Sequence, residues 1–127
     1  MTPTEIAQKI WAKMRATENA NGDYTRAHWS FTAKEHRDDF IATVTTAMAD
    51  GVITAEEMHT LWKSQAEGKG WTYGKTRNFN RKVSPAIKPF AELPAREKLA
   101  FNTALTETKT IESSLDKATL DSIRLAK

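Results

Sequence analysis

The 127-residue chain contains no cysteine. This absence excludes disulfide bonds, thiolate metal sites and a cysteine nucleophile, and it fits a reducing compartment. Long apolar runs are absent too: the opening MTPTEIAQKIWAKM carries scattered charges, and no later segment approaches the roughly 20 apolar residues that span a bilayer. We therefore expect a cytoplasmic protein without membrane contact, of a length that most simply forms one domain.

Motifs of the common enzyme classes are also missing. The three histidines have no HExxH or other metal-ligand spacing, and the sequence holds no P-loop, GxGxxG or GxSxG. The acidic pairs Asp38/Asp39 and Glu56/Glu57 are adjacent in sequence, so on a helix their side chains point about 100° apart. We interpret them as solvated helix faces. The sequence predicts no enzyme activity, no metal site and no cofactor.

Acidic side chains are absent from one further stretch, Lys69 to Lys88, although the formal net charge of the chain is only +3. Between its two ends this stretch holds four more basic residues: Lys75, Arg77, Arg81 and Lys82. The rest of the chain is slightly acidic. The local potential therefore says more about a ligand than the total charge does.

Patterns typical of helices occupy the chain on either side of this stretch. Three capping boxes, each a Thr followed three residues later by Glu, precede apolar residues at helical spacing. The boxes are Thr2–Glu5, Thr32–Glu35 and Thr54–Glu57. Gly51 and Gly68 are placed to end the second and third helices. Pro94 suits the first turn of a fourth helix, which ends at residue 113 or 114, and a short last helix follows through residue 123.

Residues 70–93 have no sustained helical or strand period and contain Pro85, Pro89 and two glycines. A loop of this length is usually functional or disordered, and its aromatic and aliphatic content argues against disorder. We expect short extended pieces at WTYG (71–74) and IKPF (87–90). The predicted fold is mostly α, with four to five helices around a long ordered loop between the third and fourth helices.

The loop carries aromatic and cationic side chains together, as a clamp for an anionic ligand would. An aromatic face stacks a base at about 1–3 kcal/mol, and Arg and Lys donate to phosphate oxygens. We assign stacking to Trp71 and Tyr73, phosphate binding to Arg77 and Lys82, and contacts to a base or ribose edge to Asn78. A second interpretation stays open, in which the rings fill the core and the basic groups stay in water.

Residues Met58 to Leu105 resemble the RyR domain, the repeat of ryanodine receptors that also occurs as small free-standing proteins in bacteria and bacteriophages. The residues that carry the resemblance are Trp62, Gly70, Trp71, Tyr73, Gly74, Arg77, Lys82, Pro85, Pro89, Phe90, Leu93, Pro94 and Lys98. The upstream NGDY and Trp29 also look like phage-type members, so the resemblance extends to about Ile111. One departure is Ser84 before Pro85, where many members carry His.

The resemblance implies a nucleotide-derived ligand, because prokaryotic and viral members have been proposed to bind such molecules and the receptor repeats are associated with adenine nucleotides. We expect non-enzymatic binding of a small anionic nucleotide or nucleotide-derived signal, with Trp62 as a further wall of the pocket. In a phage protein this binding would sequester or sense a host signal in the host cytoplasm. We divide the chain into an N-terminal helical part (1–53), an RyR-like core (54–112) and a helical tail (113–127).

Two alternatives remain. In one, the protein is a protein-interaction module in which Trp62, Trp71 and Phe90 are mainly core and a surface patch docks on a partner. In the other, the basic loop binds nucleic acid. We rank nucleic-acid binding last, because the loop has few basic side chains to contact the phosphates of a nucleic acid.

Overall fold

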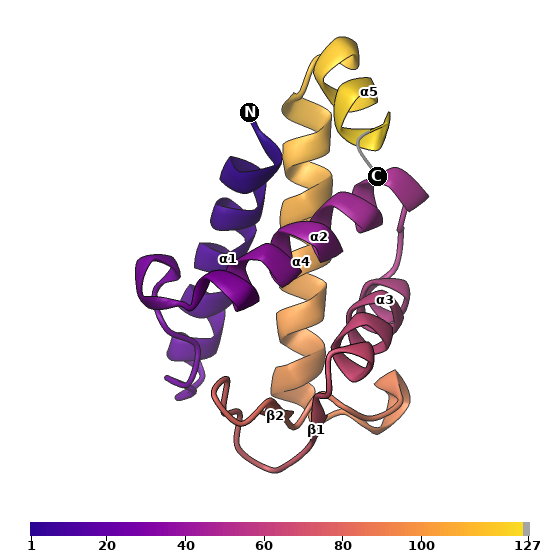
Figure 1. Ribbon diagram of the computed structural model, residues 1–127. Coiled ribbons are helices and arrows are strands. Elements are labelled where there is room, and N and C mark those ends of the chain that lie inside the picture. The colour runs from indigo at the N-terminus through magenta and orange to yellow at the C-terminus, as the bar shows by residue number, and fades with distance from the viewer. Residues whose placement is uncertain (126–127) are drawn as a thin grey trace.

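The computed structural model describes residues 1–125, and within them the fold is mostly helical, with five α-helices and a two-stranded parallel sheet. Figure 1 shows α4 (Ala95–Ser114) as a central column, with α1 (Pro3–Ala20) along one side and α3 (Ala55–Gly68) on the other. Helix α2 (Lys34–Asp50) crosses in front of α4, and the short α5 (Lys117–Leu125) packs on α2. The fold class predicted from the sequence is confirmed.

Helix α1 begins as predicted. The Thr2 hydroxyl accepts a hydrogen bond from the Glu5 amide at 3.2 Å, and the Glu5 carboxylate accepts from the Thr2 amide. Pro3 stands in the first turn, where its missing N–H is no loss. The apolar stripe of this helix is buried, and it consists of Ile6, Ala7, Ile10, Trp11 and Met14.

Helix α2 starts differently from the prediction. Thr32 was expected to cap it, but the N-cap is Ala33, which makes no side-chain hydrogen bond. The reason is a 3₁₀ turn, Trp29–Phe31, immediately before it: the Thr32 hydroxyl donates to the carbonyl of His28 at 3.1 Å and closes that turn instead. The predicted end is confirmed, because Gly51 lies in the left-handed region with φ 67°.

The other helix ends agree with the sequence pattern. The Thr54 hydroxyl accepts from the Glu57 amide at 3.1 Å and caps α3. Helix α4 follows Pro94 directly and ends at Ser114, and α5 is the predicted short last helix. No helix among residues 1–125 is long and apolar enough to cross a membrane.

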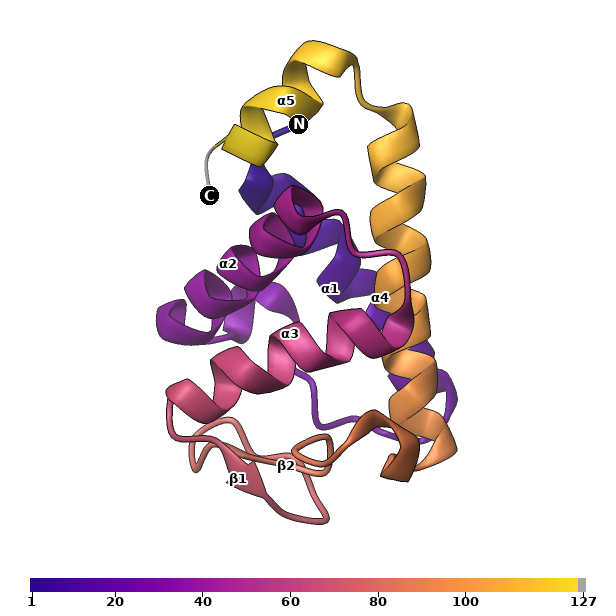
Figure 2. The same ribbon diagram turned by 90° about the vertical axis from the view of Figure 1, so that its right-hand side faces the viewer.

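The loop between α3 and α4 is folded on itself at the bottom of the molecule (Figures 1 and 2). Strand β1 (Thr72–Tyr73) pairs in parallel with β2 (Val83–Ser84), which confirms the extended piece at residues 71–74. The extended piece predicted at residues 87–90 forms no strand: Pro89 has extended backbone angles, but a 3₁₀ turn, Phe90–Glu92, begins directly after it. Gly74 is required where β1 meets β2, because a Cβ there would lie 2.1 Å from Cγ1 of Val83.

Two hydrophobic clusters flank α4. One joins α1, α2 and α4 around Trp11, and the other joins α3, the loop and α4 around Phe101. Figure 2 shows α2 and α3 running side by side across one side of α4, with the loop below them. This arrangement places the candidate site between four helices and the loop.

Candidate functional site

A cavity of about 360 Å³ lies between α1, α2, α3, α4 and the loop after α3. Its volume falls in the range of about 300–1,000 Å³ that is usual for small-molecule pockets. Most of its surface is apolar. Its charged lining residues are of two kinds: Arg26, Arg77 and Glu97 are buried, whereas Asp39 and Lys69 reach solvent. These features make it the leading candidate for a ligand site.

Six aromatic side chains form what we call the aromatic wall of this cavity. They are Trp11, Phe40, Trp62, Trp71, Phe79 and Phe101. The rings are in contact one after another: the ring centroids are 5.5 Å apart for Phe101 and Trp62, 6.4 Å for Trp62 and Trp71, and 5.6 Å for Trp71 and Phe79. Trp71 and Phe79 meet edge to face at 88°, a favourable arrangement for ring quadrupoles.

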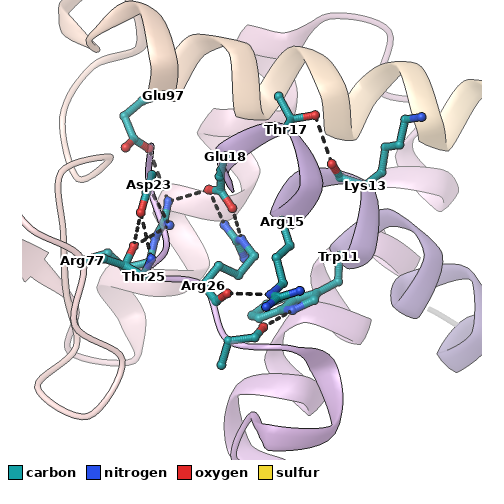
Figure 3. Close-up of polar contacts among 11 residues, drawn as sticks. Trp11, Lys13, Arg15, Thr17, Glu18, Asp23, Thr25, Arg26, Arg77 and Glu97 are labelled. Atoms are coloured by element: carbon teal, nitrogen blue, oxygen red, sulfur yellow. Dashed lines mark hydrogen bonds and ion pairs between the residues drawn. The ribbon is translucent and has the colours of Figure 1, made fainter. Parts of the chain in front are cut away.

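At the buried end of the cavity, Arg26, Arg77 and Glu97 line it and belong to an ion cluster that also includes Glu18 and Asp23 (Figure 3). Arg77 is at its centre and is only 9 % exposed. Its Nη2 lies 2.9 Å from a Glu18 oxygen and 3.5 Å from Glu97 Oε2, while Nη1 donates to Asp23 at 3.3 Å and to the Thr25 hydroxyl at 3.1 Å. The guanidinium therefore ties the loop to α1, to the segment after α1 and to α4.

Arg26 is the second cation of the cluster. Its Nε donates to Glu18 at 2.6 Å, and its guanidinium carbon lies 4.4 Å from the centre of the Trp11 ring. Burial lowers the pKa of Arg26 from its usual value, and the charge of Arg77 lowers it further, although Glu18 acts in the opposite direction. Arg26 thus connects the ion cluster to the aromatic wall.

Asp23 and Glu97 contact Arg77 but make no ion pair with Arg26, and their pKa values are shifted in opposite directions. Burial raises the pKa of Asp23, but hydrogen bonds from Thr25 and the charge of Arg77 outweigh it, so this pKa lies below its usual value. Burial raises the pKa of Glu97 above its usual value, and the carboxylates of Glu18 and Asp23 add to that rise. With all groups ionised, three carboxylates face two guanidinium groups, which leaves one negative charge in excess.

The mouth of the cavity lies between α2 and α3. The lining residues there that reach solvent are Asp39, Ala42, Gln65, Gly68 and Lys69. Two contacts cross the mouth: the Thr43 hydroxyl donates to Oε1 of Gln65, and the Lys69 ammonium lies 3.8 Å from an Asp39 oxygen. The second contact is exposed and weak.

The structure brings together three of the six predicted site residues. Trp62, Trp71 and Arg77 all line the cavity, Trp71 with a 9 % exposed side chain. Tyr73, which was predicted to stack beside Trp71, does not line the cavity: it is 45 % exposed, and the Lys88 ammonium lies 4.2 Å from the centre of its ring.

The other two predicted residues, Lys82 and Asn78, do not line the cavity. The Lys82 ammonium is 2.7 Å from a Glu35 oxygen and donates to the carbonyl of Lys69 at 3.0 Å. Asn78 accepts a hydrogen bond from the Arg81 amide and lines a second, more open hollow, which shares His36, Arg77 and Phe79 with the cavity. Contacts of these residues with a ligand stay predictions.

Sequence reasoning missed most of the aromatic wall and the acidic half of the ion cluster. Trp11, Phe40 and Phe101 were predicted only as apolar helix faces. A signal for the acids was present: Glu18 continues the buried stripe of Ile10 and Met14 at intervals of four, and a carboxylate on a buried stripe indicates a buried partner. Among residues 1–125, no group of three His, Asp or Glu side chains is arranged to hold a metal ion.

Comparison with known families places most of the folded chain in a known family. The family model described as RyR domain matches residues 43–114, which is more than half of the chain. The matched segment begins within α2 and ends with α4, so it contains the whole loop, Arg77 and Glu97. Glu18, Asp23 and Arg26 lie outside it, although they complete the ion cluster.

Proposed function

Since the chain belongs to the RyR domain family, we propose that its cavity binds a small nucleotide or nucleotide-derived signalling molecule and releases it chemically unchanged. The RyR domain is not a known enzyme family. The observation that carries the proposal is the aromatic wall around a cavity of about 360 Å³ with an opening to solvent. Binding without conversion suits a protein that sequesters or senses a signal, including one exchanged between phage and host.

The aromatic wall favours a planar ring system as the part of the ligand that goes inside. Base stacking on an aromatic side chain is worth about 1–3 kcal/mol, and it depends little on which base is bound. A phosphate is a poor occupant of the same space, because moving an anion into an apolar interior carries a large desolvation penalty. We therefore place the base in the cavity and the phosphate at the mouth, where the exposed Lys69 is available.

This placement changes the partner that we assign to the phosphate. The sequence suggested Arg77 and Lys82. The Arg77 guanidinium already contacts Glu18, Asp23 and Glu97. The Lys82 ammonium does not line the cavity and lies 2.7 Å from a Glu35 oxygen. A phosphate that reached Arg77 would have to displace at least one carboxylate and would meet the excess negative charge of the cluster. At the mouth, Lys69 has only the weak contact with Asp39 to lose.

Titration calorimetry with folded protein tests the proposal, using adenine nucleotides, ADP-ribose derivatives and cyclic dinucleotides as probes. We expect one nucleotide per chain, and we expect Trp62→Leu to weaken binding at least about tenfold, because it removes one stacking face worth roughly 1–3 kcal/mol. Phe90→Leu is the matched control: Phe90 packs in the same hydrophobic cluster but does not line the cavity. If none of these nucleotides binds to the folded protein, the proposal is contradicted.

A second candidate function is docking of a protein partner, and exposed aromatic side chains favour it. Tyr24 is 75 % and Phe31 is 85 % exposed, although large apolar rings are usually covered. Chemical cross-linking in host lysate followed by mass spectrometry tests this function. We expect Phe31→Ser to abolish a specific cross-link and to leave nucleotide titrations unchanged, and the same cross-links in wild type and variant would contradict it.

A further inference from the structure

Glu97 is a carboxylate inside the cavity with a poor hydrogen-bond partner. The residue is 2 % exposed, it lines the cavity, and the one ion pair or hydrogen bond of its carboxylate among the described residues is with Nη2 of Arg77 at 3.5 Å. Glu18, in the same cluster, is bound at 2.6 Å by Arg26 and at 2.9 Å by Arg77. A buried carboxylate is usually satisfied by several good donors. Glu97 therefore has acceptor capacity left for a ligand.

The terminal nitrogens of Arg77 have little left to offer a ligand anion. Nη1 of Arg77 is directed at Asp23 and Thr25, and Nη2 at Glu18 and Glu97. The cluster carries more carboxylates than guanidinium groups. This end of the cavity repels an anion and accepts a hydrogen-bond donor.

Two more buried polar side chains line the cavity with unused hydrogen-bonding groups. Ser84 is 1 % exposed, and its oxygen accepts from the Ala86 amide, but its hydroxyl hydrogen has no acceptor within residues 1–125. The ring nitrogens of His36, which is 9 % exposed, have no hydrogen-bond partner in the described part of the chain. A ligand that uses these groups presents ring nitrogens as well as donors, as a nucleobase does.

We propose that Glu97 is the specificity-determining residue of this cavity and selects a heterocycle that presents an amino or ring N–H donor to the buried end. This inference rests on the proposed function and adds the orientation of the ligand: donor edge toward Glu97, phosphate toward the mouth. The raised pKa of Glu97 agrees with it, because burial has removed solvation that a ligand donor would replace. A site with an unpaired buried polar group rejects analogues that lack the matching group.

Adenosine and purine riboside test this proposal, because the two nucleosides differ only in the exocyclic amine. We expect the wild-type protein to bind adenosine at least about tenfold more tightly, because a hydrogen bond to a charged group contributes more than one between neutral groups. In Glu97→Leu, which removes both carboxylate oxygens, the preference should fall to about twofold or less. Glu97→Gln keeps the shape of the side chain and one acceptor oxygen, so we expect a preference for adenosine between those of the wild type and the leucine variant. This variant replaces Glu97→Leu in the test if the leucine variant does not fold.

Asp23→Asn is the matched control. Asp23 also contacts Arg77, at 3.3 Å, but it does not line the cavity. We expect this variant to keep the wild-type preference for adenosine. If Glu97→Leu lost the preference only because the ion cluster was disturbed, Asp23→Asn would lose the preference too.

The possible failures are distinguishable. Equal binding of the two nucleosides, a preference for purine riboside, or a preference that survives in both Glu97 variants overturns the inference and leaves the proposed function standing. Binding of nucleotides without binding of either nucleoside also overturns it, because phosphate would then make the main contact. If no nucleoside and no nucleotide binds, both the inference and the proposed function fail.

Discussion

Arg77 shows how one side chain organises this protein. It belongs to the loop between α3 and α4, yet its partners come from three other parts of the chain: Glu18 at the end of α1, Asp23 after it, and Glu97 in the first turn of α4. Because the guanidinium is 9 % exposed, solvent screens these contacts poorly. Arg77, for which the sequence suggested a phosphate, therefore holds the loop against α1 and α4.

We expect Arg77→Ala to lower the free energy of unfolding by about 3–5 kcal/mol, because it leaves buried carboxylates without their cation. Urea denaturation followed by circular dichroism measures this change. Lys82→Ala is the control, since it removes a cation of the same loop whose partner Glu35 is exposed, and its effect should be much smaller. Similar midpoints for wild type and Arg77→Ala would contradict the structural role of Arg77.

His59 gives the protein a second residue with a measurable signature. It is 1 % exposed, it packs against the rings of Phe90 and Phe101, and its Nε2 lies 2.8 Å from the carbonyl of Ala86. Burial lowers the pKa of His59 below its usual value, although the Ala86 carbonyl acts against that shift. The folded state therefore keeps the imidazole neutral at pH values where the unfolded chain already binds a proton.

It follows that the free energy of unfolding falls as the pH drops below about 6.5, the ordinary pKa of His, and that the full contribution is present above it. We expect His59→Gln to show a flatter dependence than wild type between pH 7 and pH 5, in denaturation curves recorded at each pH. Glu97 has a raised pKa and so acts in the opposite direction, but it is present in both proteins and cancels in the comparison. Parallel curves would contradict this role for His59.

The ends of the helices show which local signals hold at the scale of an element. Thr2 and Thr54 cap α1 and α3 as their sequences predict, whereas Thr32 stands in an equally good sequence pattern and closes a 3₁₀ turn instead. The pattern describes what a side chain is able to cap. The conformation of the preceding residues decides whether it does, and in α2 the turn at Trp29–Phe31 takes the hydroxyl first.

Two glycines at helix ends should respond oppositely to alanine. Gly51 has φ 67°, where an L-residue is disfavoured by roughly 1–2 kcal/mol, so Gly51→Ala should destabilise the protein by about that amount. Gly68 is within α3 and a Cβ there would meet nothing within 4 Å, so Gly68→Ala should be neutral or stabilise by up to about 1 kcal/mol. Thermal denaturation of the two variants beside wild type measures both, and equal shifts in one direction would contradict the assignment.

At the scale of the whole molecule, the candidate site is built from segments that the family match does not fully contain. The match covers residues 43–114, whereas Trp11 of the aromatic wall and Glu18 of the ion cluster belong to α1. Helix α1 also lies against α4 along much of its length (Figure 1). Helices α1 and α2 therefore line the same cavity as the rest of the matched segment.

We expect the isolated fragment 43–114 to lack a cooperative unfolding transition. Without α1, the buried face of α4 that includes Ala100, Ala104 and Ile111 is exposed, and Arg77 loses Glu18. Circular dichroism during urea titration, with the full-length chain as control, measures this. A sharp transition in the fragment would mean that the segment folds without α1.

The sequence by itself determined the helices, most of their ends, the long loop and the extended piece at its start. These features depend on residues within a few positions of one another, such as Thr2 with Glu5 or Gly51 with its own backbone angle. Local patterns of apolar spacing, capping residues and glycines are therefore enough to predict them.

Only the tertiary structure decided which of the loop's side chains face inward. Arg77 and Asp23 are 54 positions apart, and Trp11 and Phe79 meet from opposite halves of the chain. The sequence could name Trp71 and Tyr73 as a pair, but the fold buries the first and leaves the second outside. Charge pairing and ring contacts depend on distance in space, which the packing of α1, α4 and the loop fixes and no local pattern encodes.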